Sequence, residues 1–342
     1  MAETPDLLTE ALAECHFPDM DALSDVLRVV GLTGGVFMDA RFTAPWCVSG
    51  NIGPDSCKPF MSPPGYVIGF HHIIKGSCVV ALDGEAPCTL TAGDIVLVTR
   101  NVVHRLGSGL DVEAVPSERL VSPPDGTGLA RINHGGGGAE CLMICGFLGG
   151  HEQLQPLTET LPSLMTMSVR DMPGGDWISQ SFQYGARQLT DGDPGAATIM
   201  AKISELLFVE AVRRYLVTMP PERTGLLAGL RDPAIGKALS LLHTQIARAW
   251  TADDLAGAAN LSRSAFAERF TLLIGQPPIK YLTNWRMQVA AQKLREGRLS
   301  IGQIAFDVGY DSEASFTRAF KRELGSPPAV WRRRRTGGAD AP

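Results

Sequence analysis

Two copies of one helical pattern lie near the C-terminus, and the clearer copy reads IAFDVGYDSEASFTRAFKRELGSPPAVW over residues 304–331. The other copy reads LAGAANLSRSAFAERFTLLIGQPPIKY over residues 255–281. Two phenylalanines four residues apart and a Gly-x-Pro-Pro ending recur in both copies after fifty residues. A repeat of this period, built from short helices, indicates two copies of one supersecondary unit.

Each copy has the sequence pattern of a helix-turn-helix. Asn260 and Gly309 stand at the turn, where a residue that tolerates positive φ is favoured. Ser262 in the first copy, and Asp311 or Ser312 in the second, suit the N-cap of the following helix. Because residues four apart share one face of a helix, the paired phenylalanines predict the buried face of that second helix.

A single long helix is predicted between the copies, over residues 279–295. Together these features resemble the AraC/XylS family of bacterial transcription regulators, whose DNA-binding domain joins two helix-turn-helix units by a linker helix. The match covers roughly the last hundred residues. Pro327 stands where the family usually has Ser or Thr, so a capping hydroxyl is lost there.

The resemblance implies that the outward positions of the second helix in each unit contact DNA. Arg318 is suited to bidentate pairing with guanine, and Glu268 or Glu313 to accepting a hydrogen bond from the cytosine amino group. Arg269 and Lys321 suit either phosphate contact or simple solvation. The full set of candidates is Ser264, Ala267, Glu268, Arg269, Glu313, Ala314, Thr317, Arg318 and Lys321.

Charge divides the chain in the same place. Residues 232–342 carry 16 Lys and Arg against 10 Asp and Glu, a balance of +6, whereas residues 1–231 carry a balance of −11. A basic C-terminal domain on an acidic body is typical of a nucleic-acid-binding protein with a separate second module. The family resemblance implies double-stranded promoter DNA and RNA polymerase as partners, with activation as the usual outcome.

The N-terminal half predicts a helix at 21–30 and then many short strands separated by Gly and Pro turns. Strands are expected at 35–42, 66–70, 73–82, 89–90, 95–98 and 139–147, which favours a small β-barrel or jelly roll. The expected fold class is therefore α+β: a cupin-like β-barrel with flanking helices, followed by an all-α domain of two helix-turn-helix units.

Two motifs carry the cupin resemblance: one runs from Gly65 through His71 to Gly84, and the other from Gly93 to His104. Ile73 and Ser77 occupy positions where metal-binding cupins carry ligands, so two imidazoles remain, too few for a closed or catalytic metal site unless His72 or a cysteine substitutes. We therefore expect no metal, no cofactor and no enzymatic activity. His71, His72 and His104 become candidates for an effector pocket. The alternatives are a cupin-type metalloenzyme fused to a DNA-binding domain and a constitutive architectural protein without an effector.

All seven cysteines precede residue 146, and none forms a Cys-x-x-Cys motif. The reducing cytosol argues against a disulfide framework, and buried inert thiols are one reading. Some members of this cupin subgroup are thiol-based oxidant sensors, so oxidation is the other reading, with Cys78, Cys88, Cys141 and Cys145 as candidates. Cys78 and Cys88 flank a predicted hairpin and face each other only if its turn has three residues. Cys141 and Cys145 are about 13 Å apart along a strand, too far to bridge.

Helical periodicity returns at residues 177–189 and 196–216. The second helix is apolar enough to form a homodimer contact or to pack on its own barrel. We expect a cupin-like domain at 1–170, a helical dimerisation and linker region at 171–225, an AraC-type DNA-binding domain at 232–335 and a disordered tail at 336–342. The absence of a long apolar run or signal-peptide pattern predicts a cytoplasmic protein without membrane contact.

Overall fold

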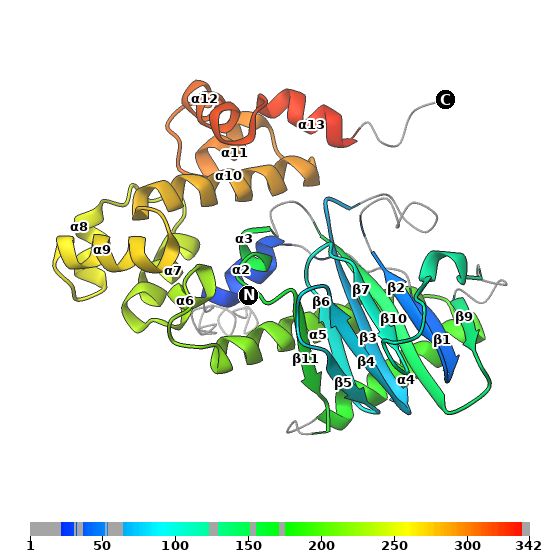
Figure 1. Cartoon of the computed structure of the whole chain (residues 1–342). Helices are drawn as coiled ribbons and strands as arrows, with labels where there is room; N and C mark the ends of the chain where they lie inside the picture. The colour runs from blue at the N-terminus through cyan, green and yellow to red at the C-terminus, as the bar shows by residue number, and fades with distance from the viewer. Residues whose placement is uncertain are drawn as a thin grey trace, which may run out of the picture. The chain divides into compact units, whose positions relative to one another are not determined.

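The computed structural model of the chain describes residues 22–30, 32, 37–51, 53, 64–122, 129–150, 155–170 and 175–336. Backbone contacts divide the chain into two compact units (Figure 1). Residues 30–220 form the sheet unit, and the segments before residue 30 and after residue 220 form the helical unit. Among the described residues, no helix is long and apolar enough to cross a membrane.

Two sheets build the sheet unit. The larger has the order β11-β6-β3-β10-β1-β9 and the smaller the order β5-β4-β7-β2-β8. The strands of the larger sheet are β1 (Phe37–Thr43), β3 (Tyr66–Lys75), β6 (Asp94–Val98), β9 (Ala130–Gly135), β10 (Glu140–Gly150) and β11 (Leu164–Ser168). Those of the smaller sheet are β2 (Cys47–Gly50), β4 (Ser77–Leu82), β5 (Cys88–Thr91), β7 (His104–Gly107) and β8 (Val115–Pro116).

The core lies between these sheets and includes the stacked rings of Phe42 and Trp46, whose centroids are 4.0 Å apart. The expected cupin-like sheet domain is present, but its sheets do not close into a barrel. Over the described residues they remain two separately hydrogen-bonded layers. The smaller sheet ends in strands of only four and two residues, β5 and β8, which offer too few backbone groups to extend a ladder to the other sheet.

Helices α4 (Gly175–Asp191) and α5 (Ala196–Thr218) form a hairpin in the sheet unit, which also holds α3 (Gln155–Thr158) and the 3₁₀ turn η2 (Ser117–Arg119). Gly185 lets the hairpin close, because a Cβ there would lie 2.2 Å from the Met200 sulfur. Helix α5 buries Leu207 and Phe208, so it packs on its own unit. It also leaves Leu206 49% exposed.

The helical unit contains both predicted repeats. Its elements are α2 (Ala22–Val30), α6 (Leu226–Arg231), α7 (Pro233–Thr244), α8 (Ala252–Ala258), α9 (Arg263–Ile274), α10 (Pro278–Glu296), α11 (Ile301–Asp307), α12 (Glu313–Leu324) and α13 (Pro328–Thr336). Helix α10 is the predicted linker helix, and α8–α9 and α11–α12 are the two helix-turn-helix units (Figure 1).

The local signals of the repeat are confirmed. Asn260 and Gly309 adopt φ of 54° and 82° at the two turns. The Ser262 side chain accepts a hydrogen bond from the backbone of α9. Ser312, rather than Asp311, caps α12 in the same way. Each cap satisfies a backbone N–H that the first turn of a helix leaves free.

Candidate functional site

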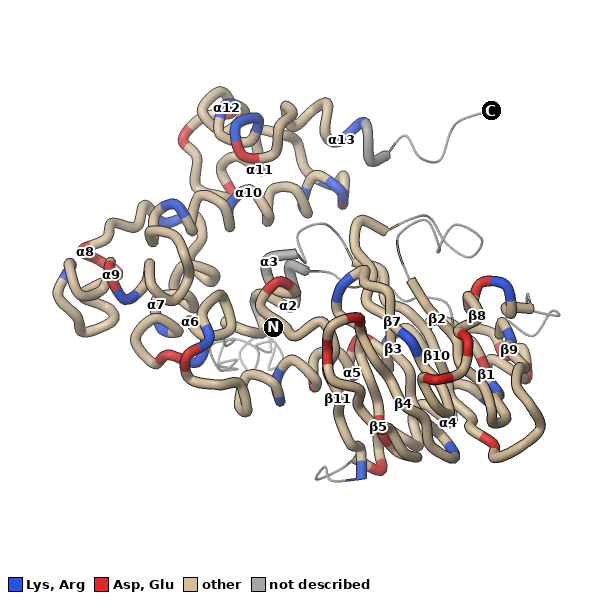
Figure 2. The backbone as a smooth tube through the Cα atoms, in the orientation of Figure 1, with Lys and Arg blue, Asp and Glu red and all other residues tan. Residues whose placement is uncertain are grey.

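Helices α9 and α12 bury their phenylalanines completely and turn their candidate DNA-contact residues outward. On α9, Ser264 and Glu268 are exposed and Ala267 is half-buried. On α12, Glu313, Ala314, Arg318 and Lys321 are exposed and Thr317 is half-buried. Lys and Arg also mark α10 and α13 within the same unit (Figure 2).

Arg269 is placed differently from the other candidates. Its Nε donates to Asp232 Oδ2 at 2.9 Å. Asp232 in turn caps α7, its Oδ1 accepting from the backbone nitrogens of Ala234 and Ile235 at 3.0 Å. Arg269 therefore ties α9 to the start of α7. In contrast, neither Arg318 nor Lys321 forms an ion pair with any described residue.

Arg286, on the linker helix α10, is a positioning residue that the sequence did not reveal. Its guanidinium donates to Ile246 O at 2.9 Å, to Arg248 O at 2.8 Å and to Gly309 O at 3.2 Å. Ile246 and Arg248 precede the first helix-turn-helix unit, and Gly309 is the turn of the second. The Arg286 side chain thus links both helix-turn-helix units to the linker helix α10. The position of Arg286 in the sequence does not distinguish it from the other Lys and Arg residues of α10. Its positioning role therefore could not be predicted from the sequence.

In the sheet unit, three of the predicted residues form a chain between the two sheets. His71 on β3 lies opposite Cys145 on β10, and His71 Nδ1 is 2.9 Å from Cys145 Sγ. Its Nε2 is 3.2 Å from Nε2 of His104, which comes from β7 in the other sheet. We name this the His71–His104–Cys145 chain.

The positions of the hydrogen atoms in the His71–His104–Cys145 chain follow from the acceptor at its end, the carbonyl of Val102. His104 Nδ1 lies 3.4 Å from the carbonyl of Val102, which can only accept a hydrogen bond. With that proton on Nδ1, His104 Nε2 accepts from His71 Nε2, and His71 Nδ1 accepts from the Cys145 thiol. Every member is then satisfied as a neutral group.

Burial favours those neutral forms. It lowers the pKa of His71 to about 3, with a further contribution from His104. Burial also lowers the pKa of His104 and raises that of the Cys145 thiol. The three side chains of the His71–His104–Cys145 chain are therefore uncharged at neutral pH.

His72 is not part of this chain. As the next residue on β3, it points to the opposite face of the sheet, where its ring packs edge-on against Phe182 of α4 at 5.5 Å. Burial lowers its pKa to about 4. The predicted effector-pocket histidines thus divide between two sides of one sheet.

The second group of predicted residues is a pair of core cysteines from the two sheets, Cys78 on β4 and Cys141 on β10. The hydrogen bond from Cys78 lowers the pKa of Cys141, while the same bond and burial raise the pKa of Cys78. Both are free thiols and both belong to the core. The spacing of the cysteines in the sequence does not predict that Cys78 and Cys141 come together, because they lie on strands of different sheets.

The hairpin pairing considered for Cys78 and Cys88 is wrong. Cys78 lies opposite Leu90, and Cys88 lies opposite Val80. The turn between β4 and β5 spans residues 83–87, longer than either length considered. Cys88 therefore sits two residue pairs further along the ladder, only partly buried.

A cupin-type metal does not fit this site. The two imidazoles donate and accept within their own chain, and Ile73, at a ligand position of metal-binding cupins, is fully buried in the core. Among the described residues, no group of three or more His, Cys, Asp or Glu is arranged to hold a metal ion.

Comparison with known proteins places both units in one family. Residues 21–217 match a family described as "Cupin", and residues 255–334 match one described as "Helix-turn-helix domain". A putative AraC-like transcription regulator of Streptomyces lividans is 36% identical over 320 residues, covering 93% of this chain and 99% of that protein. The chain belongs to the AraC-like family of DNA-binding transcription regulators.

Two further similarities concern individual proteins. The RCS-specific HTH-type transcriptional activator RclR of Escherichia coli K12 is 26% identical over 316 residues, covering 92% of this chain and 98% of RclR. The crystal structure of the DNA-binding domain of AdpA in complex with a target DNA covers 32% of this chain and 99% of that chain. It has 27% identity and a TM-score of 0.30.

Proposed function

We propose that the protein reads a specific operator with α9 and α12 and is controlled by oxidation of the Cys78–Cys141 pair. Two recognition helices joined by one linker helix suit two successive major grooves on one face of DNA. The exposed candidates on these helices support this reading, whereas Arg269 acts by holding α9 in place. The division into regions at residues 170, 225 and 232 stays a prediction.

Arg318 is expected to supply base specificity and Lys321 backbone affinity. Replacing Arg318 with alanine should weaken operator binding about tenfold or more and relax the preference for one base pair, because a bidentate Arg–guanine contact contributes about 1–3 kcal/mol. Replacing Lys321 with alanine should weaken binding evenly across sequences and reduce the salt slope by about one. Fluorescence anisotropy with operator and base-substituted duplexes measures both. Equal effects of both variants on all duplexes would contradict base readout by Arg318.

The single observation that supports redox control is that Cys78 and Cys141, from strands of different sheets, share one buried core cluster and each shifts the pKa of the other. Hypochlorous acid would chlorinate the Cys141 thiol to a sulfenyl chloride with release of water. Attack by the Cys78 sulfur then forms the disulfide, chloride leaves, and the Cys78 proton passes to solvent. Because an S–S bond is about 2 Å long, β4 and β10 must move toward each other. Helix α5 packs on β10 and would register that shift.

Oxidation is expected to change operator affinity about fivefold or more, the lower end of ordinary allosteric coupling. Cys78→Ser and Cys141→Ser should each abolish the response to hypochlorite or diamide. Cys88→Ser, with a partly buried thiol two residue pairs along the same ladder, serves as the matched control and should respond like the parent protein. Anisotropy with reduced and oxidised protein, together with peptide mapping of the disulfide, gives the result. An unchanged response in both variants would overturn redox control by this pair.

We also propose a homodimer that activates transcription together with RNA polymerase. The support for a dimer is the large apolar side chains that the α4–α5 hairpin leaves exposed: Trp177 is 55%, Tyr184 54% and Leu206 49% exposed. The support for activation is the resemblance to a relative named as an activator. Leu206→Glu should shift the protein toward monomer in sedimentation velocity, and an unchanged mass would exclude this face as the contact.

A further inference from the structure

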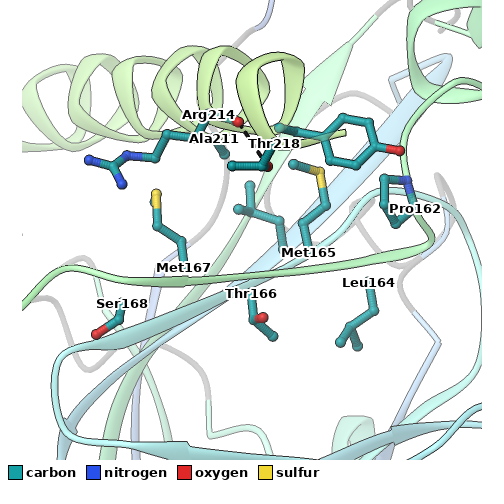
Figure 3. A pocket seen from close by; sticks show the side chains of 11 residues that line it. Pro162, Leu164, Met165, Thr166, Met167, Ser168, Ala211, Arg214 and Thr218 are labelled. Atoms are coloured by element: carbon teal, nitrogen blue, oxygen red, sulfur yellow. Dashed lines mark hydrogen bonds between the residues drawn. The ribbon is translucent and has the colours of Figure 1, made fainter. Parts of the chain in front are cut away.

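A pocket of about 370 Å³ lies in the sheet unit, away from the residues that the sequence singled out. It separates β11, at the edge of the larger sheet, from the last turns of α5. Figure 3 shows Met165 and Met167 pointing from β11 toward the helix, with Arg214 at one end of the pocket and Pro162 at the other. This volume is at the lower end of the range for small-molecule sites.

The walls of this pocket are suited to an apolar body. Leu97, Met165, Met167 and Ala211 line it, and both methionines are nearly buried. Methionine is unbranched, and its thioether adapts to the shape of an alkyl chain or the edge of an aromatic ring. An apolar guest would therefore find close contacts without a rigid requirement on its outline.

The charged groups at the pocket favour a negatively charged ligand. Arg214 Nε donates to Glu210 Oε1 at 2.8 Å, but Glu210 also binds Arg213, whose Nε is 2.8 Å from Oε2. One carboxylate thus faces two guanidinium groups, and the trio keeps a formal charge of +1. Among the described residues, the terminal nitrogens of Arg214 have no acceptor, so they remain available for an anion.

The hydroxyl of Tyr215 supplies a second polar contact. It is enclosed by protein yet makes no hydrogen bond to any described residue. An enclosed hydroxyl without a partner is uncommon, because its lost hydration is not replaced. A ligand oxygen in the pocket would satisfy it.

We propose that this pocket binds a small organic anion, a carboxylate or sulfonate on an apolar body, as an effector. Arg214 pairs with the anionic group and the Tyr215 hydroxyl donates to the ligand, while the methionines enclose the apolar part. Helix α5 ends at Thr218, another lining residue, and the chain then runs directly into the helical unit. Binding acts on the last turns of α5. This effector role rests on the proposed function, whereas binding itself does not.

The test titrates the full chain with 8-anilinonaphthalene-1-sulfonate, which carries a sulfonate on an apolar body and fluoresces when enclosed. We expect saturable binding at one site per chain. Decanoate or 1-naphthoate should displace the dye, and the better competitor distinguishes an alkyl from an aromatic ligand. Arg214→Gln should weaken binding tenfold or more, and Met165→Trp, which fills the pocket, should abolish it.

Arg213→Gln is the matched control. Arg213 pairs with the same Glu210 but is 60% exposed and does not line the pocket, whereas Arg214 is 33% exposed. Arg213→Gln should weaken dye binding much less than Arg214→Gln does, because both variants lose one positive charge but only Arg213→Gln keeps the Arg214 nitrogens that face the pocket. Thermal melting checks that each variant is folded. If Met165→Trp does not fold, the Arg214→Gln variant still tests the proposal.

Several results would overturn the proposal: binding that does not saturate, displacement by neither acid, or equal weakening in the Arg213 and Arg214 variants. Dye binding without any effect of the better competitor on operator affinity would overturn the effector role. If the protein binds no operator at all, the proposed function fails, but the dye titration still decides whether the pocket binds anions.

Discussion

Replacing Arg286 with alanine is expected to lower the free energy of unfolding of the helical unit by about 3 kcal/mol and to abolish operator binding. Three carbonyl groups, those of Ile246, Arg248 and Gly309, lose their donor at once. Each of the three hydrogen bonds is expected to contribute about 1 kcal/mol, because water replaces part of each lost bond around a half-exposed guanidinium. Because these carbonyls belong to both helix-turn-helix units, their relative placement on the linker helix is lost with them.

Urea denaturation measures the stability change, and anisotropy with operator DNA measures binding. Arg286→Lys is the informative control, since lysine keeps the positive charge but lacks the planar fork that reaches three acceptors. We expect it to recover less than half of the stability and little of the affinity. Full recovery with lysine would show that charge alone matters. Intact binding by the alanine variant would show that the two units hold their positions without Arg286.

The helical unit was predictable because its signals are local. A residue that tolerates positive φ, a capping hydroxyl and two phenylalanines four residues apart each act within one turn of a helix, and each occurs twice. Arg286 escaped prediction for the opposite reason. Its three acceptors lie 40, 38 and 23 residues away in the chain, and no local pattern encodes such contacts.

The sheet unit was predictable only in outline. Strands β2, β7, β8, β9 and β11 were not predicted; all five are six residues or shorter, and β8 has only two. A short strand has too few residues for an alternation of apolar and polar side chains to be recognised in the sequence. The Cys78–Cys141 and His71–His104 contacts depend on how two sheets face each other, which sequence spacing does not determine. The cupin resemblance grouped His71, His72 and His104 as pocket candidates, and the structure brings only His71 and His104 into contact.

Acid is expected to destabilise the sheet unit well above the pH at which carboxyl groups titrate. His71 and His72 have pKa values of about 3 and about 4 in the folded chain because burial disfavours the imidazolium, whereas an unfolded histidine titrates at about 6.5. Between those values only the unfolded chain takes up the protons. Stability is therefore complete above the unfolded pKa and falls as the pH drops below 6.5.

The expected loss is about 1.4 kcal/mol per pH unit for each buried imidazole, or roughly 4–5 kcal/mol for the two at pH 4.5. Carboxyl groups with lowered pKa values, such as Glu140, lose their contribution only below their unfolded pKa near 4.3, so the window from pH 6.5 to 4.5 isolates the histidines. Urea midpoints at half-unit steps across this window give the slope. His72→Gln should reduce that slope by about one proton, because glutamine can pack against α4 without titrating. It leaves the His71–His104–Cys145 chain untouched, so the remaining slope reports on that chain alone. A flat profile in the parent protein would mean that these imidazoles take up protons without unfolding, and the neutral hydrogen-bonded chain would then be wrong.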